Sequence, residues 1–215
     1  MKRVILTSSA AAVSIKNSKA RSHEHDLVMD EENWTDVEFL ASEKPPAWGY
    51  PVSKTLAEKA AWKCADENHI DLITVIPSLA AGPAMTSDVP SSIPIAMSLV
   101  TGNEPQIKTL KSMELVSGSI SIPHVEDVVQ AHIFLPKRNL RYICYTVNSS
   151  IVEIAKFLKA RYPQYDITTD FEEGPATTML SSEKLIKEGF RFKYGIDEIY
   201  EQSIQYLKEV GILQK

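Results

Sequence analysis

Tyr50 and Lys54 lie four positions apart in the segment WGYPVSKTLAEKAAW, whose apolar residues recur at helical spacing. Residues four apart share one face of a helix, with their Cβ atoms about 5–6 Å apart. A lysine ammonium at that distance favours the ionised form of a phenol and so lowers its pKa. A phenol tuned in this way can give or take the proton that accompanies hydride transfer to a carbonyl. The same ammonium can also donate hydrogen bonds to the hydroxyls of a cofactor ribose.

A serine hydroxyl from the preceding strand could complete this site. Ser8 and Ser9 follow the apolar run at residues 4–6, and open α/β sheets bind ligands at the carboxyl ends of their strands. The Ser9 hydroxyl could polarise a substrate oxygen there. Tyr-x-x-x-Lys also arises by chance in many helices, and two serines often form only a turn. The strand ends TSSA upstream and IPSLAAGP downstream favour the catalytic interpretation.

The elements around these residues predict a βαβ unit. Residues 3–7 and 71–76 are short apolar runs typical of buried parallel strands, and the Ala-rich helix from Pro51 separates them. Such a crossover should be right-handed. Residues 14–47 are polar and irregular, and we expect them to form an exposed loop with at most a short turn.

The second half of the chain predicts further helices and short strands. Residues 84–118 should form a helix and a loop, and a short strand should precede a helix that opens near Val125. RYICYTV has the pattern of a strand, and the helix after it could be capped by Ser149 or Ser150 in a capping box with Glu153. Two late helices are predicted in TTMLSSEKLIKEGFRF and IDEIYEQSIQYLKEVGIL.

These elements predict an α/β fold with a Rossmann-type parallel sheet, helices on both faces and a smaller C-terminal substrate-binding region. We expect one domain, with residues 1–83 and part of 120–150 in the sheet core and residues 84–119 and 150–215 mainly in the substrate-binding region. The first strand already ends in functional-looking residues, and few further strands are available to flank it. We therefore expect an incomplete sheet that lacks an N-terminal portion.

Composition excludes several classes of function. The 215 residues are 44% hydrophobic and 24% charged, and the formal net charge of -5 argues against a nucleic-acid partner. Cys64 and Cys144 are isolated in apolar surroundings, which favours reduced thiols over a disulfide frame or a zinc site. No apolar run approaches the roughly 18 residues of a membrane span, and none resembles a signal peptide. We therefore expect a cytoplasmic protein without a membrane span.

Other residues that could do chemistry favour structural roles. His124 could lie on the floor of a substrate cleft, but a lone histidine is more often structural, and Asp127 should cap or pair locally. His23 and His25 lie in an acidic segment without further ligands, which indicates a solvated loop rather than a metal site. We expect no metal. Among the tryptophans, Trp48 borders Tyr50 and could line the pocket.

Several segments resemble the short-chain dehydrogenase/reductase superfamily, namely VILTSSAAAV, WGYPVSKTLAEKAAW, IDLITVIPSLAAGP and RYPQYDI. The segments SEKPPAWGYP, VPSSI, VTGNE, SGSISIPHVEDV and SSEKLIKEGF resemble its extended plant branch of dihydroflavonol, cinnamoyl-CoA and anthocyanidin reductases. The anthocyanidin reductases are the nearest of these, and the resemblance runs from Lys2 to Leu213. It implies an NADPH-dependent oxidoreductase of flavonoid biosynthesis that reduces anthocyanidins to flavan-3-ols.

Three alternatives remain open. A dihydroflavonol 4-reductase or a cinnamoyl-CoA reductase would have the same architecture. The chain could also be an inactive fragment that cannot hold the cofactor.

The resemblance also assigns residues to roles. It implies Ser9, Tyr50 and Lys54 as the catalytic set, and places the last two at the cofactor together with Pro77, Ser78, Leu79 and Ser92. For the flavonoid substrate, the candidates are Ser14, Trp48, Met85 and Met97, with Ile93 and Leu115 as further apolar lining. Dihydroflavonol reductases tend to have asparagine five residues after the catalytic serine, and Ser14 stands there instead.

The chain departs from the family pattern in two places. The Gly-x-x-Gly-x-x-Gly fingerprint is absent, and such a turn lets the backbone approach a pyrophosphate at a helix N-terminus. Its absence removes most of the expected cofactor anchorage. Residues 16–26 are longer than the family pattern predicts and could alter the substrate lid.

Overall fold

The structure is a computed structural model that describes residues 3–17, 27–86, 88–135, 140–172 and 178–214. Within these ranges the strands are β1 (Val4–Thr7), β2 (Leu27–Met29), β3 (Leu72–Pro77), β4 (Ile120–Ile122), β5 (Leu140–Cys144), β6 (Val147–Ser149) and β7 (Thr178–Leu180). The helices are the short η1 (Ala10–Ala12), then α1 (Val37–Glu43), α2 (Gly49–Glu67), α3 (Ser92–Ala96), α4 (Ser98–Thr101), α5 (Glu104–Ser117), α6 (Val125–Phe134), α7 (Ile151–Arg161), α8 (Glu183–Lys187) and α9 (Ile196–Glu209).

A parallel sheet in the order β1-β3-β5 forms the centre of the fold. The central strand β3 is buried along nearly its whole length, as its continuous apolar sequence predicts for a strand covered on both faces. Pairing of Thr7 with Val75 and of Pro77 with Cys144 brings the carboxyl ends of the three strands to one edge. The predicted α/β architecture and its βαβ unit are confirmed.

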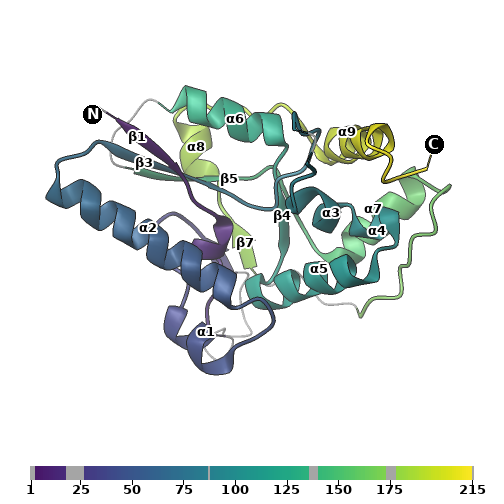
Figure 1. Ribbon diagram of the computed structural model, residues 1–215, viewed down its shortest axis with the longest axis horizontal. Coiled ribbons are helices and arrows are strands. Elements are labelled where there is room, and N and C mark those ends of the chain that lie inside the picture. The colour runs from purple at the N-terminus through teal and green to yellow at the C-terminus, as the bar shows by residue number, and fades with distance from the viewer. Residues whose placement is uncertain (1–2, 18–26, 87, 136–139, 173–177, 215) are drawn as a thin grey trace.

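Helices cover the two faces of this sheet. One face presents Ile73, Val75 and Tyr142, which pack against α6 and α8 in one hydrophobic cluster. The opposite face is covered by α2, and Figure 1 shows α2 and α6 on the two sides of the strands. The first turns of α2 lie beside the carboxyl edge of the sheet, because Tyr50 and Lys54 donate hydrogen bonds to Ser9 and Thr7 at the end of β1.

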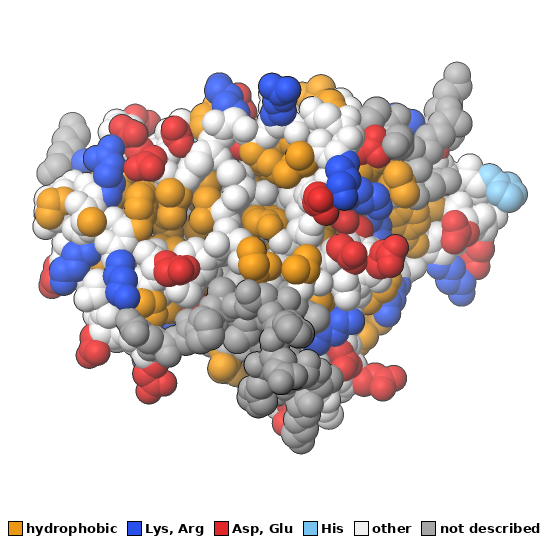
Figure 2. Space-filling model, turned by 180° about the vertical axis from the view of Figure 1, so that it is seen from behind, with side chains coloured by type: hydrophobic (Ala, Val, Ile, Leu, Met, Phe, Trp, Pro, Cys, Tyr) orange, Lys and Arg blue, Asp and Glu red, His pale blue; other side chains and the backbone are white. Residues whose placement is uncertain are grey.

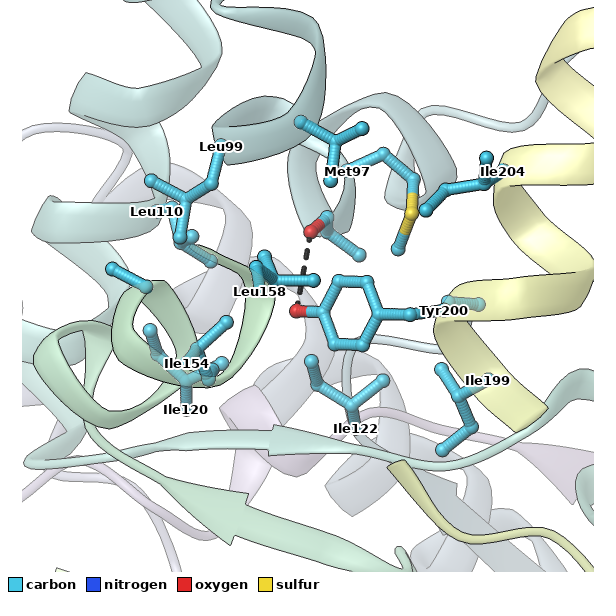
Figure 3. Close-up of a cluster of buried hydrophobic side chains, with 14 of the residues drawn as sticks. Met97, Leu99, Leu110, Ile120, Ile122, Ile154, Leu158, Ile199, Tyr200 and Ile204 are labelled. Carbon is cyan, nitrogen blue, oxygen red and sulfur yellow. Dashed lines mark hydrogen bonds between the residues drawn. The ribbon is translucent and has the colours of Figure 1, made fainter. Parts of the chain in front are cut away.

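A second apolar core lies in the helical part of the chain and is larger than the clusters on the sheet. Figure 3 shows Tyr200 of α9 at its centre, surrounded by side chains of α4, α5, α7 and β4. The Tyr200 hydroxyl donates to the carbonyl oxygen of Ala96 at 3.4 Å, and burial raises the pKa of this phenol. This core supports α5 and β4, which form one wall of the cavity described below.

Two small sheets connect these regions. Strands β2 and β7 pair in parallel although about 150 residues separate them, and the hydroxyl of Tyr145 donates to the carbonyl of Leu180 nearby. Strands β4 and β6 pair antiparallel, with Ser121 opposite Asn148. The pairing of β4 with β6 therefore joins the segment after α5 to the segment after β5.

Side-chain caps fix where several helices begin. Ser150 accepts from the Glu153 amide at 3.2 Å and Glu153 accepts from the Ser150 amide at 2.9 Å, so the capping box predicted at the start of α7 is confirmed. Asp36 caps α1 and Asn103 caps α5 in the same manner, with side-chain oxygens that accept backbone N–H groups.

The sequence-based expectation was wrong for two segments. Part of the predicted irregular loop at 14–47 is structured: α1 buries Leu40, and β2 buries Met29. The first of the two late helices is instead strand β7 followed by the short helix α8. In both segments, pairing of β2 with β7 supplies hydrogen bonds between stretches that carry no strong local pattern.

The surface carries charges of both signs. Figure 2 shows separate apolar patches on one face, with lysine, arginine, aspartate and glutamate side chains between and around them. The described residues on that face form no continuous basic area, which agrees with the net charge of -5. Among the described residues, no helix has the length and apolar character needed to cross a membrane.

The two cysteines should differ sharply in reactivity. Cys64 is exposed, whereas Cys144 is fully buried in the sheet core, where burial raises its pKa to about 12. Because the thiolate is the reactive form, we expect one thiol to react with a disulfide reagent in the native chain and both to react in denaturant. Rapid reaction of both thiols without denaturant would contradict this packing. Cys64→Ser is the matched control and should remove the native reaction.

Candidate active site

The carboxyl end of β1 places two adjacent serines on opposite sides of the backbone. Ser9 has an extended backbone, with φ -157° and ψ 146°, and caps the short helix η1 by accepting from the Ala11 amide at 3.3 Å. Neighbouring side chains alternate in extended chain. Ser8 therefore faces the covered side of the sheet, where its hydroxyl donates to Glu58 at 2.5 Å.

The predicted catalytic side chains meet at this strand end. The Tyr50 hydroxyl donates to Ser9 Oγ at 3.3 Å, and the Lys54 ammonium donates to the carbonyl oxygen of Thr7 at 3.4 Å. Tyr50 is 57% exposed, so its hydroxyl is accessible to a ligand. The helix spacing that suggested a shared face for Tyr50 and Lys54 thus brings both to β1.

Beneath these groups lies a buried ion pair that joins α2 to the sheet. The Glu58 carboxylate accepts from Arg141 Nε of β5 at 2.7 Å and from the Trp62 indole at 3.4 Å. Arg141 in turn donates to the carbonyl oxygens of Glu31 and Asn33, and its guanidinium lies 3.7 Å from the centroid of the Trp34 ring. These contacts fix the position of α2 against the strands.

A cavity of about 820 Å³ opens in front of Ser9 and Tyr50. Its walls come from the end of β1, the segment before α2, the residues after β3, the inner face of α5, strand β4 and strand β7. The walls are mainly apolar and carry many serine and threonine hydroxyls, and Lys108 of α5 is the charged side chain among the described lining residues. Such a cavity suits a planar aromatic ligand that bears polar substituents.

The predicted cofactor residues fall into two groups. Ser78, Leu79 and Ser92 line the cavity together with Tyr50, whereas Pro77 ends β3 just outside the lining. The Ser78 hydroxyl is buried and finds no hydrogen-bond partner among the described residues. An unpaired buried hydroxyl at the carboxyl end of a parallel strand lies where such sheets bind ligands.

The predicted substrate residues are also divided. Ser14 and Trp48 line the cavity. Met97 is instead fully buried in the helical core, and Met85 is fully exposed away from the lining. Ile93 is buried and Leu115 is exposed, so neither is a lining residue either.

The cavity has walls that the sequence reasoning missed. One face of α5 contributes Lys108, Thr109, Ser112, Met113 and Val116, at the spacing of a helical stripe. That spacing is present in the sequence, although the pattern of residues 84–118 predicts only a helix and a loop. Further missed lining residues include Pro45, Pro46 and Ala47 before α2, Ser119 and Ser121 at β4, and Thr178 and Leu180 of β7.

The histidines in the described part of the chain show no metal-binding arrangement. His124 caps α6 through Nδ1, which accepts from the Glu126 amide at 3.2 Å, and its ring stacks on Tyr194 with centroids 3.9 Å apart. Burial lowers its pKa, which favours the neutral ring in this structural role. Among the described residues, no group of histidine, cysteine and carboxylate side chains could hold a metal ion. His23 and His25 lie outside the described residues.

Asp127 has a structural role that differs from the local one predicted. Its carboxylate accepts from the backbone amides of Lys193 and Tyr194, which lie 66 and 67 positions away. It therefore ties α6 to the segment before α9. Trp34 and Trp62 have packing roles, because both contact the ion pair beneath the site.

The chain is similar in sequence to a known protein family and to several plant reductases. The model of the NAD dependent epimerase/dehydratase family matches residues 2–142. An anthocyanidin reductase ((2S)-flavan-3-ol-forming) from Vitis vinifera is 62% identical over 219 residues, which cover 100% of this chain and 64% of the relative. A dihydroflavonol 4-reductase from Gerbera hybrida is 39% identical, with coverage of 99% and 56%. The chain thus spans less than two thirds of the length of these relatives.

Two solved structures share the fold. Vestitone reductase from alfalfa matches with a TM-score of 0.82 and 37% identity, over 99% of this chain and 66% of that one. Yeast methylglyoxal/isovaleraldehyde reductase complexed with NADPH matches with a TM-score of 0.74 and 25% identity, again over 99% and 66% of the two chains.

The buried ion pair leads to a stability prediction. Arg141→Met would leave the Glu58 carboxylate buried without its cation, so we expect the free energy of unfolding to fall by about 3–5 kcal/mol. Urea denaturation followed by circular dichroism measures this loss. Lys63→Ala is the matched control, because it breaks the exposed Lys63–Glu67 pair at 3.8 Å and should cost less than about 1 kcal/mol. Equal losses in the two variants would contradict the assigned role of the buried pair.

Proposed function

The chain belongs to the NAD dependent epimerase/dehydratase family, and from that premise we propose that it carries the catalytic and substrate-binding residues of an NADPH-dependent reductase that converts anthocyanidins to flavan-3-ols. The observation that carries the proposal is the hydrogen bond of 3.3 Å between Tyr50 and Ser9 at an open cavity, with Lys54 one helical turn away.

The residues present fit a nicotinamide nucleotide in two respects. The unpaired, buried Ser78 hydroxyl lies in the cavity lining, and Ser92 lines the same cavity. Among the described residues Lys54 donates one hydrogen bond, to Thr7, so its ammonium keeps N–H groups for ribose hydroxyls. Pro77 and Leu79 flank Ser78 and would bound the nicotinamide ring. The yeast reductase of similar fold was solved with NADPH, which supports the same cofactor here.

The hydrogen bonds of Ser9 define what its hydroxyl can do. Ser9 Oγ accepts from Tyr50 and from the Ala11 amide, so its own hydrogen remains available to a ligand. It would therefore donate to a substrate oxygen and stabilise negative charge that develops there. The extended backbone at Ser9 and the Ser8–Glu58 bond keep this hydroxyl aimed at the cavity.

Tyr50 is the proton donor in this proposal. Conversion of a flavylium cation to a flavan-3-ol adds two hydrides and one proton, and bound NADPH would supply the hydrides. Tyr50 would deliver the proton from its accessible hydroxyl. The Lys54 ammonium on the same helix face would stabilise the negative charge left on the phenol oxygen. The apolar cavity walls would exclude water from the reacting ring.

Substitution of the proton donor tests this assignment. Tyr50→Phe should lower kcat with cyanidin and NADPH by at least about 100-fold, because a positioned general acid contributes about 10²–10⁴-fold. The variant should fold normally, since the Tyr50 ring is largely exposed. Tyr165→Phe is the matched control, because Tyr165 packs against the helical core and should leave turnover unchanged. Chromatography of the products identifies the flavan-3-ol, and full activity of Tyr50→Phe would refute the role.

The same assay separates the related activities. Conversion of a dihydroflavonol or an acyl-CoA thioester in place of cyanidin would favour one of the other reductases of this branch. The higher identity to the Vitis vinifera anthocyanidin reductase than to the Gerbera hybrida dihydroflavonol 4-reductase supports cyanidin as the first substrate to test.

Cofactor binding is tested without turnover. Titration of the purified chain with NADPH, followed by nucleotide fluorescence, should give saturable binding. Lys54→Met should weaken it by about tenfold, since hydrogen bonds from a charged group contribute about 1.5–3 kcal/mol. Lys59→Met is the control, because Lys59 lies on α2 over the Trp34 ring and away from the cavity. Absence of saturable binding in the unaltered chain would identify an inactive fragment and overturn the proposal.

A further inference from the structure

We propose that Asn148 makes the adjoining wall of the cavity a hydrogen-bond acceptor. Asn148 itself lies outside the cavity lining. A wall of this kind binds aromatic rings with free hydroxyl groups more tightly than their O-methyl ethers. The proposal rests on the proposed function, because it concerns the phenolic substrate of that same cavity. It concerns the wall formed by Ser117, Ser119 and Ser121, called the serine wall below.

The arrangement begins with the pairing of β4 and β6. Ser121 and Asn148 are directly opposite each other in this antiparallel pair, and Ser119 precedes β4 on the same side of the strand. Both serine hydroxyls donate to the side-chain oxygen of Asn148, at 3.0 Å from Ser119 and at 2.5 Å from Ser121. One amide oxygen therefore holds two hydroxyls of the cavity lining in fixed orientations.

These bonds determine what the hydroxyls offer to a ligand. A serine hydroxyl has one hydrogen and two lone pairs. Because the hydrogens of Ser119 and Ser121 are engaged by Asn148, only lone pairs remain for the cavity. The hydroxyl of Ser117 is engaged in the same manner by the carbonyl oxygens of Met113 and Ser119, at 2.6 and 2.8 Å. All three residues of the serine wall therefore act as acceptors.

Because Ser119 and Ser121 are buried, their acceptor character strongly affects which ligands the cavity binds. Ser119 is 6% exposed and Ser121 is 7% exposed, so water has little access to their lone pairs once a ligand fills the cavity. A ligand that brings O–H groups satisfies these acceptors, whereas a methyl ether brings a second acceptor and leaves both sides unpaired. Because both hydroxyls contact the same amide oxygen, they are close enough for two neighbouring hydroxyls on one ring to reach them.

Equilibrium binding of product-like ligands tests the proposal without turnover. Catechin carries two adjacent ring hydroxyls and undergoes no reduction, and its 3′,4′-di-O-methyl ether lacks those donors. Isothermal titration of the purified chain should give at least about tenfold tighter binding of catechin, because the ether leaves the buried lone pairs of both serines unpaired. The ratio of the two dissociation constants is the measured quantity.

Substitutions of Asn148 test its role in setting the wall polarity. Asn148→Leu removes the shared acceptor and frees both serine hydroxyls to turn and donate to a methoxy oxygen. We expect the binding ratio to fall below about threefold. Asn148→Asp keeps an oxygen that accepts from both serines and should retain the tenfold ratio. A double Ser119→Ala, Ser121→Ala variant should also lose the preference, and adding Asn148→Leu to it should change the ratio no further.

The outcomes separate this proposal from the proposed function. Equal binding of catechin and its dimethyl ether by the unaltered chain would overturn the acceptor wall and leave the reductase proposal standing. A ratio unchanged in a folded Asn148→Leu variant, checked by circular dichroism, would also overturn it. If neither catechin nor its dimethyl ether binds, both proposals are overturned, because the cavity would then not be a flavonoid site.

Discussion

The structure depends on one constraint, which is the attachment of helix α2 to the carboxyl end of β1. Three side chains at successive turns of the helix, Tyr50, Lys54 and Glu58, contact three successive residues of the strand end, since they bond to Ser9, Thr7 and Ser8 respectively. The innermost contact is anchored by the buried pair with Arg141, so α2 cannot slide along the strand without breaking a desolvated ion pair. The buried contacts of Glu58 with Ser8 and Arg141 thereby also fix the position of the exposed contact between Tyr50 and Ser9.

The cavity depends on two hydrophobic cores at once. The sheet core holds the ends of β1 and β3, where Ser9 and Ser78 are located. The helical core around Tyr200 holds α5 and β4, which form the facing wall. Because each wall is fixed by its own close-packed cluster, a change in either core would alter the width of the cavity without touching a residue that lines it.

Sequence patterns predicted the parts of this structure that depend on local chemistry. The βαβ unit, the spacing of Tyr50 and Lys54 and the capping box of Ser150 and Glu153 follow from apolar periodicity and from hydrogen bonds within a few residues. Strand β7 was missed because its partner β2 lies far away in the chain, and a three-residue strand has little pattern of its own. The placement of Met97 failed for a related reason: periodicity indicates that a side chain is apolar, but only packing decides whether it faces a core or a cavity.

The sequence likewise does not predict which hydroxyls donate and which accept hydrogen bonds, although this direction determines what the cavity can bind. Ser9, Ser119 and Ser121 are the same residue type in the sequence, which does not distinguish their roles. In the fold, Ser9 accepts from Tyr50 and keeps its hydrogen for a ligand, whereas Ser119 and Ser121 give theirs to Asn148. The two parts of the lining therefore differ in polarity: Ser9 can donate to a ligand beside Tyr50, whereas Ser119 and Ser121 can only accept. A ligand with an oxygen acceptor at one position and hydroxyl donors at another would be oriented by this difference before any chemistry occurs, since the reversed pose leaves the buried hydroxyls of Ser119 and Ser121 unpaired.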